Sequence, residues 1–185
     1  MDAEKQKMSE IVTKIFNNLY KKDDYKIRKV ENDILLNGQE ISYYVFMQGV
    51  RSKIGKLYER IFSELCNLNR PGQGFDLFCK DRKIYIELKN TTNTDNFDSK
   101  NSKFNKLKKF KSEHQDCEVL YICMNESRNK YPNGVDYVYE NSFRIITGDI
   151  AWDYMCQLGD ISKQDLIEIL RKLFDEYLND INFYN

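Results

Sequence analysis

Three charged residues interrupt two short apolar runs in the stretch GFDLFCKDRKIYIELKN, residues 74–90. Asp76 directly precedes Leu-Phe-Cys, while Glu87 and Lys89 follow Ile-Tyr-Ile in the second run. Burying an unpaired charge costs several kcal/mol, so charged groups on buried strands are usually paired or bind a metal. The two carboxylates and the amine are therefore candidates for a joint chemical role.

The spacing of these charges predicts a metal-assisted hydrolytic site. If the two runs pair as neighbouring strands, Asp76 and Glu87 lie side by side, and Glu87 and Lys89 project from the same face. Two carboxylates that close repel each other unless a cation is present. Such oxygen ligands suit Mg²⁺, which is held by one or two carboxylates together with waters and substrate phosphate. A neighbouring lysine orients a water or stabilises charge on phosphate. This set is typical of phosphodiester hydrolysis.

A simpler interpretation of the three charges stays open. In a chain of which 31% is charged, the pattern also arises by chance, and solvent-facing strand positions commonly carry Glu and Lys. Placement favours the metal site, because the charges interrupt apolar runs instead of lying in a polar loop. Asn90 and Asn93 add polar groups just beyond it. Asn pairs bidentately with adenine, and it equally contacts phosphate or caps a turn.

Apolar periodicity predicts the elements that would position these residues. We expect a strand pair at 75–79 and 84–88, joined by a turn at 80–83, and two further strands at 117–124 and 143–146. Helices are expected from Met8 to Leu19, at 51–67, through Phe104, Leu107 and Phe110 after a polar segment at 90–102, at 150–158, and from a cap at Ser162 onward. This order predicts an α/β fold with a central mixed β-sheet flanked by helices.

Composition bounds the class of protein. The 185 residues suggest one domain, and 29 basic residues balance 29 acidic ones, so net charge does not indicate a nucleic-acid partner. Five cysteines without CxxC spacing are typical of buried free thiols in a reducing compartment. No apolar segment approaches the ~20 residues that span a bilayer. We therefore expect a soluble, cytoplasmic protein without membrane partners.

One segment of the chain is strongly basic although the net charge is zero, and it could bind nucleic acid. Between Asp98 and Glu113 the chain has no acidic residue but six lysines: Lys100, Lys103, Lys106, Lys108, Lys109 and Lys111. The apolar edge of the same segment lets a helix dock while its lysines face outward. Next to the candidate site, this is a phosphate-binding surface. The alternative is an ordinary solvated helix face.

The motif also resembles a known family. GFDLF followed by IYIELKNTTNTDN is similar to the active-site signature of the PD-(D/E)XK nuclease superfamily, and within it to type II restriction endonucleases. SKIGKLYERIF resembles the helix that precedes the motif, and FRIITGDIAWDYM resembles a downstream segment. The resemblance covers roughly residues 50–158, with Phe75 in place of the name-giving proline. Residues 1–48 have no such match.

The resemblance implies a role for each matching residue. Asp76 and Glu87 would bind Mg²⁺ with the Leu88 carbonyl as a third ligand, and Lys89 would position or activate the attacking water. Glu59 matches a helix glutamate that reaches the metal in some members, or is a solvated residue. The fold implied is a restriction-endonuclease-like core at 50–158, within a single nuclease domain at 1–185 whose helical N-terminal region, 1–48, has an uncertain role.

These implications predict a Mg²⁺-dependent type II restriction endonuclease that cuts double-stranded DNA at a specific site, leaving 5′-phosphate and 3′-hydroxyl ends. A homodimer acting on a near-palindromic site is the economical way to cut both strands, and a companion DNA methyltransferase would be a separate protein. The alternatives are a repair or junction-resolving nuclease of the same fold, a catalytically silent DNA-binding module, or a structural protein with chance motif residues.

Overall fold

The computed structural model describes residues 3–20, 38–71, 74–91, 97–125 and 134–180. The chain divides into two compact units, one comprising residues 1–61 and 164–185 and the other residues 62–163. The sequence predicts that all 185 residues serve as one nuclease domain, and this stays a prediction.

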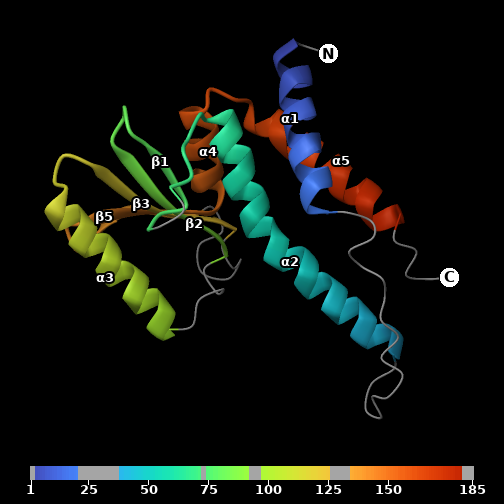
Figure 1. Cartoon of the computed structure of the whole chain (residues 1–185), viewed down its shortest axis with the longest axis horizontal. Helices are drawn as coiled ribbons and strands as arrows, with labels where there is room; N and C mark the ends of the chain where they lie inside the picture. The colour runs from blue at the N-terminus through green and yellow to red at the C-terminus, as the bar shows by residue number, and fades with distance from the viewer. Residues whose placement is uncertain (1–2, 21–37, 72–73, 92–96, 126–133, 181–185) are drawn as a thin grey trace. The chain divides into compact units, whose positions relative to one another are not determined.

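The second unit is built on a five-stranded mixed sheet (Figure 1). Its strands are β1 (Leu77–Cys79), β2 (Ile84–Thr91), β3 (Glu118–Asn125), β4 (Asp136–Tyr139) and β5 (Phe143–Thr147), in the order β1-β2-β3-β5-β4. The central pairs β2–β3 and β3–β5 are parallel, while β1 and β4 are antiparallel edge strands. The sequence prediction of a mixed α/β sheet flanked by helices is confirmed, as is the β1–β2 hairpin.

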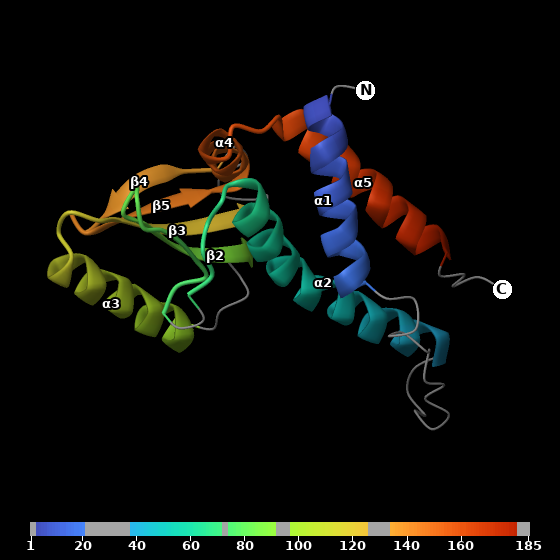
Figure 2. The same cartoon turned by 45° about the horizontal axis from the view of Figure 1, so that its top comes forward.

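Helices cover both faces of this sheet. Figure 2 shows α3 (Phe97–Glu113) on one face and α4 (Gly148–Leu158) on the other. The burial of β3 agrees, because all six residues from Val119 to Met124 are buried although their side chains alternate between the two faces. A strand buried on both faces reads as a continuous apolar run, which is why the sequence located β3 readily.

The core under α3 is rich in aromatic residues. The Phe104 ring lies 5.1 Å from Tyr121 and 5.1 Å from Phe143, both in edge-on contacts, which aromatic pairs prefer to face-to-face stacking. The buried cluster consists of Phe75, Phe104, Leu107, Val119, Tyr121, Cys123, Phe143 and Ile145. Because Tyr121 and Cys123 pair with Glu87 and Lys89 in register, the α3 face is also the face of the candidate site.

The first unit contains α1 (Ala3–Leu19), the part of α2 (Gly38–Leu65) up to Ile61, and α5 (Lys163–Asp180) from Gln164 onward. Phe16 of α1 packs edge-on against Phe174 and Tyr177 of α5 at 4.9 and 5.9 Å. At the other end of the pair, the Lys5 ammonium lies 2.7 Å from Asp165 and 2.8 Å from Glu168. These contacts hold two helices together that are far apart in the sequence.

The main differences from the sequence prediction are two helix starts and one strand. α2 begins at Gly38 and not near residue 51, and α3 begins at Phe97 inside the expected polar segment. β4 was not predicted at all. Its Tyr137 and Val138 side chains are 46% and 60% exposed, so the strand carries no core pattern and is defined by backbone pairing to β5.

The structure also shows the state of the cysteines and whether a described helix could span a membrane. All five cysteines are free thiols, four of them buried. Within the described ranges, no helix is both long and apolar enough to span a bilayer.

The sheet core yields a stability prediction. Leu120 on β3 is fully buried, so Leu120→Ala is expected to lower the free energy of unfolding by about 2–5 kcal/mol through lost packing and a residual cavity. Val138→Ala, on the exposed edge strand, should change it by less than about 0.5 kcal/mol. Urea denaturation of both variants measures the difference, and equal losses would contradict the assigned core.

Candidate active site

The structure brings Asp76, Glu87 and Lys89 together at one end of the β1–β2 hairpin. Asp76 occupies the bend directly before β1, and the other two residues lie on β2. The Lys89 ammonium lies 2.7 Å from Glu87 Oε1 and 3.1 Å from Asp76 Oδ2. One amine thus bridges two carboxylates from neighbouring segments, as the strand spacing predicted.

The backbone of β2 orients the Asp76 carboxylate. The Asp76 N–H donates to the Ile86 carbonyl at 3.0 Å, and the Leu88 N–H donates to Asp76 Oδ2 at 2.7 Å. Since the N–H and C=O of one residue in an extended strand point to the same edge, the Leu88 carbonyl lies on the Asp76 side of β2. The Leu88 carbonyl, the predicted third metal ligand, therefore lies on the same edge of β2 as the Asp76 carboxylate. Its role as a ligand stays a proposal.

The paired charges of the site are largely buried, so their interactions affect the pKa of Lys89. Glu87 is 8% exposed, and only Thr147 is a comparably buried polar residue in the described part of the chain. Burial, the largest single influence, lowers the pKa of Lys89, but the charges and hydrogen bonds of Asp76 and Glu87 together raise that pKa above the ordinary lysine value. Lys89 is therefore an ammonium ion at neutral pH.

The groups in this site that could bind a cation are oxygen atoms of carboxylates and of a backbone carbonyl. Across the described residues, no group of three or more His, Cys, Asp or Glu side chains is arranged to hold a metal. The site instead has two carboxylates and one strand carbonyl. This donor set fits Mg²⁺, which retains several waters and needs one or two protein carboxylates, and it does not suit a metal that prefers nitrogen or sulfur.

The predicted site residues outside the charge cluster and α3 are Glu59, Asn90 and Asn93. Glu59 belongs to α2 in the first unit, and its place near the carboxylates stays a prediction. Asn93 lies outside the described residues. Asn90 follows Lys89 on β2, and its Oδ1 accepts a hydrogen bond from Asn125 Nδ2 at 2.8 Å.

Asn125 is a residue that the sequence reasoning missed. It ends β3, which runs parallel to β2, so the carboxyl ends of both strands lie at one edge of the sheet, where the Asn125 and Asn90 amides pair. Its position as the first polar residue after the apolar run of β3 was the available signal.

Several lysines of α3 contact protein oxygens. Lys106 donates to the Gly74 carbonyl, Lys108 pairs with Glu140, and Lys111 donates to the Gln115 and Cys117 carbonyls at 2.7 and 2.6 Å. The partner of Lys108 lies on the turn between β4 and β5, and those of Lys111 lie just beyond the helix. These contacts attach α3 to the body of its unit.

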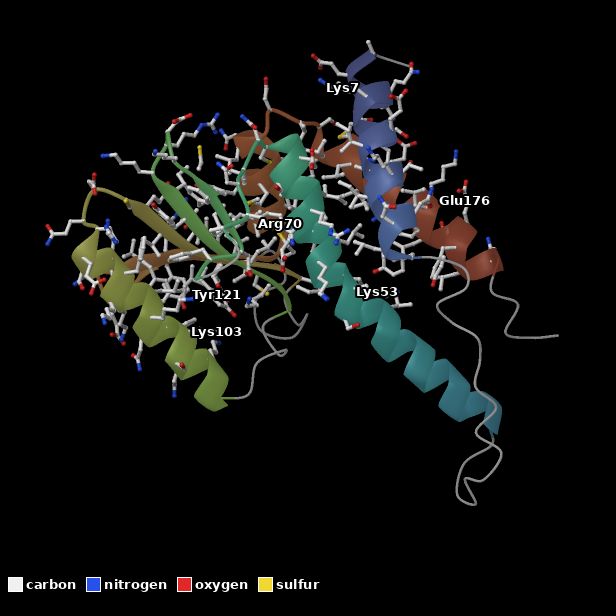
Figure 3. All side chains as sticks on the ribbon, viewed as in Figure 1. Lys7, Lys53, Arg70, Lys103, Tyr121 and Glu176 are labelled. Atoms are coloured by element: carbon white, nitrogen blue, oxygen red, sulfur yellow. The ribbon has the colours of Figure 1, made fainter. Side chains whose placement is uncertain are left out.

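Lys100 and Lys109 have different surroundings. The Lys100 ammonium lies 5.5 Å from the Phe104 ring centre, and Lys109, 77% exposed, lies 3.9 Å from Glu113. Figure 3 shows nitrogen-tipped side chains, that of Lys103 labelled among them, projecting from α3. The helix therefore offers positive charge to solvent in addition to its internal contacts.

The electrostatics of Lys89 lead to a pH prediction. Lys89→Met keeps the apolar stem but removes the ammonium, and we expect it to lower the free energy of unfolding at neutral pH by about 1–3 kcal/mol. The folded-state pKa is raised, so this contribution is complete below the ordinary lysine pKa of 10.5 and is lost as pH rises through the folded value. The difference in unfolding free energy between wild type and Lys89→Met should therefore decrease as pH rises above 10.5.

Urea denaturation from about pH 8 to about pH 12 measures this gap, because the loss begins near 10.5 and continues up to the raised folded-state pKa. Lys109→Met is the matched control, because its ammonium is largely solvated and its removal should cost less than about 0.5 kcal/mol. A gap for Lys89→Met that stays constant across the range would contradict the assigned charge pairing.

Comparison with known proteins assigns the chain to a family. Neither a search of curated proteins nor a search of solved structures gave a match. The family model for the Eco47II restriction endonuclease matches residues 46–179, which is more than half of the chain and contains Asp76, Glu87 and Lys89. This confirms the resemblance to type II restriction endonucleases: the chain belongs to the Eco47II restriction endonuclease family.

Proposed function

We propose that this protein is a Mg²⁺-dependent endonuclease that cuts double-stranded DNA at a specific site, as a type II restriction enzyme. The observation that carries the proposal is the contact of the Lys89 ammonium with both Asp76 and Glu87, in a chain of a restriction endonuclease family. Two carboxylates and an amine at the end of a strand pair correspond to the PD-(D/E)XK signature and suit phosphodiester hydrolysis.

Each residue has a role in this proposal. Asp76, Glu87 and the Leu88 carbonyl would hold Mg²⁺, which when bound lowers the pKa of water and neutralises charge on phosphate. The Lys89 ammonium, which contacts both carboxylates, would position or activate the attacking water or stabilise charge on the phosphate. The Leu88 N–H keeps the Asp76 carboxylate oriented during these events.

The proposed reaction is hydrolysis with inversion at phosphorus. The water oxygen forms a bond to phosphorus as the bond from phosphorus to the 3′ oxygen breaks. One proton passes from the attacking water to solvent, and the departing 3′ oxygen takes up one proton from solvent. The products are a 5′-phosphate and a 3′-hydroxyl.

DNA would be held beside these residues by amides and lysines. Asn90 lies next to Lys89 on β2, and we include Asn93 on its sequence position alone. Lys100, Lys103 and Lys109 on α3 are the lysines we assign to phosphate contacts, with Lys108 joining them only if its pair with Glu140 opens. Phosphate contacts of this kind supply affinity and orientation without reading bases.

A homodimer and a DNA methyltransferase complete the proposal. Two copies related by a two-fold axis would place one site on each strand of a near-palindromic sequence. A separate methyltransferase would protect the cell's own copies of that sequence.

Removing the amine tests the function. Purified protein is incubated with plasmid and phage DNA in Mg²⁺ or in EDTA, beside Lys89→Ala and Glu87→Gln. We expect discrete fragments that require Mg²⁺, and a loss of about 10²–10⁴-fold in the single-turnover rate for each variant, since each lacks a group that acts on the reacting atoms. Lys80→Ala, on the exposed turn of the same hairpin, is the control and should cleave as wild type does.

The cleavage pattern separates the proposal from its alternatives. Cutting confined to branched DNA would indicate a repair or junction-resolving nuclease. DNA binding without cleavage in any divalent metal would indicate a silent DNA-binding module. Cleavage that persists in Lys89→Ala would overturn the assignment of the site.

A further inference from the structure

Lys106 on α3 reaches the two residues that precede Asp76. Its ammonium donates a hydrogen bond to the Gly74 carbonyl and lies 5.6 Å from the centre of the Phe75 ring. A lysine over an aromatic face is attracted by the ring quadrupole. One side chain therefore holds both the backbone and the side chain of this short segment.

Phe75 is itself anchored to α3 and to β2. It is 8% exposed, and its ring lies 4.7 Å from Phe110 of α3 and 5.3 Å from Tyr85 of β2. Gly74, just before it, has a φ of +98°, a conformation that L side chains rarely adopt, so the chain turns sharply here. The turn directs Phe75 into the core and presents Asp76 to β2.

Asp76 is thus fixed from two sides. β2 holds it by the Ile86 carbonyl and the Leu88 N–H. α3 holds it indirectly, through Lys106 on Gly74 and through Phe110 on Phe75. A carboxylate that must meet a metal ion tolerates displacement of only about half an ångström, so weakening either side should matter more for chemistry than for folding.

We propose that Lys106 is a positioning residue for Asp76, acting through Gly74 and Phe75, and is not one of the lysines that contact DNA phosphate. This inference rests on the proposed nuclease function for its activity readout. It changes the expectation from the sequence, which grouped Lys106 with the DNA-binding lysines because all six share one helix.

Salt dependence distinguishes the two roles. A lysine that neutralises a phosphate contributes about 0.9 to the slope of log affinity against log salt, so its removal lowers that slope. A positioning lysine leaves affinity and slope unchanged and lowers the rate at saturating DNA, because it affects the reacting geometry only.

The experiment compares Lys106→Met and Lys106→Arg with Lys109→Met, an exposed lysine on the same helix. DNA binding is measured in EDTA over a range of salt, and single-turnover cleavage is measured in Mg²⁺ at saturating DNA. For Lys106→Met we expect a rate about 10–100-fold lower with an unchanged salt slope. Lys106→Arg should recover to within about 3-fold, because it retains the charge and the donors. Lys109→Met should lower the salt slope, and Lys80→Ala, on the exposed turn between β1 and β2, should change neither the slope nor the rate.

Hydrogen exchange gives a readout that needs no activity. The Leu88 amide donates to Asp76 Oδ2, so displacement of Asp76 should speed its exchange by about 10-fold in Lys106→Met. The Ile122 amide, on the fully buried centre of β3, should exchange as in wild type. Selective change at Leu88 supports positioning.

Three other outcomes overturn the inference. A lower salt slope with an unchanged rate and an unchanged Leu88 amide makes Lys106 a phosphate contact. Faster exchange at both Leu88 and Ile122 makes it a general stabiliser, and no change in any measurement leaves it without a role. If wild type cleaves no DNA at all, the proposed function fails, while exchange at Leu88 still decides the positioning.

Discussion

The ammonium of Lys89 lies between two carboxylates that would otherwise repel each other at the end of a hairpin. Glu87 is almost fully buried, so the cost of its charge must be offset nearby, and Lys89 does this at 2.7 Å. The same amine contacts Asp76 from the preceding bend. The three charges meet only because β1 pairs with β2 in this register. A change in the register of either strand would separate them.

The helix α3 serves the site in two ways. As the crossover between the parallel strands β2 and β3 it covers the face on which Glu87 and Lys89 lie, and its aromatic residues fill the core beneath. Its lysines divide between the protein and the solvent, since Lys106 and Lys108 bind oxygen atoms of their own unit while Lys109 is exposed. Lysines that look alike in the sequence of α3 therefore have different surroundings in the folded protein.

Phe75 stands where the PD-(D/E)XK signature, which the sequence resembles, has its proline. A proline restricts the backbone before the aspartate covalently. Here the restriction comes from packing, because the Phe75 ring is buried between Phe110 and Tyr85 under the Lys106 ammonium. The family match across residues 46–179 includes the whole of this arrangement, and the catalytic roles built on it are our proposal.

The sequence by itself determined the strand pair, the identity of its three charges and the alternation that puts Glu87 and Lys89 on one face, because these depend on neighbours along the chain. Apolar periodicity marks only buried faces, so it missed the exposed strand β4 and the polar first turn of α3. Tertiary structure alone decided that Asn125 meets Asn90 and that Lys106 meets Gly74. Those contacts join residues far apart in the sequence, and only the packing of the sheet and α3 places them within hydrogen-bond distance.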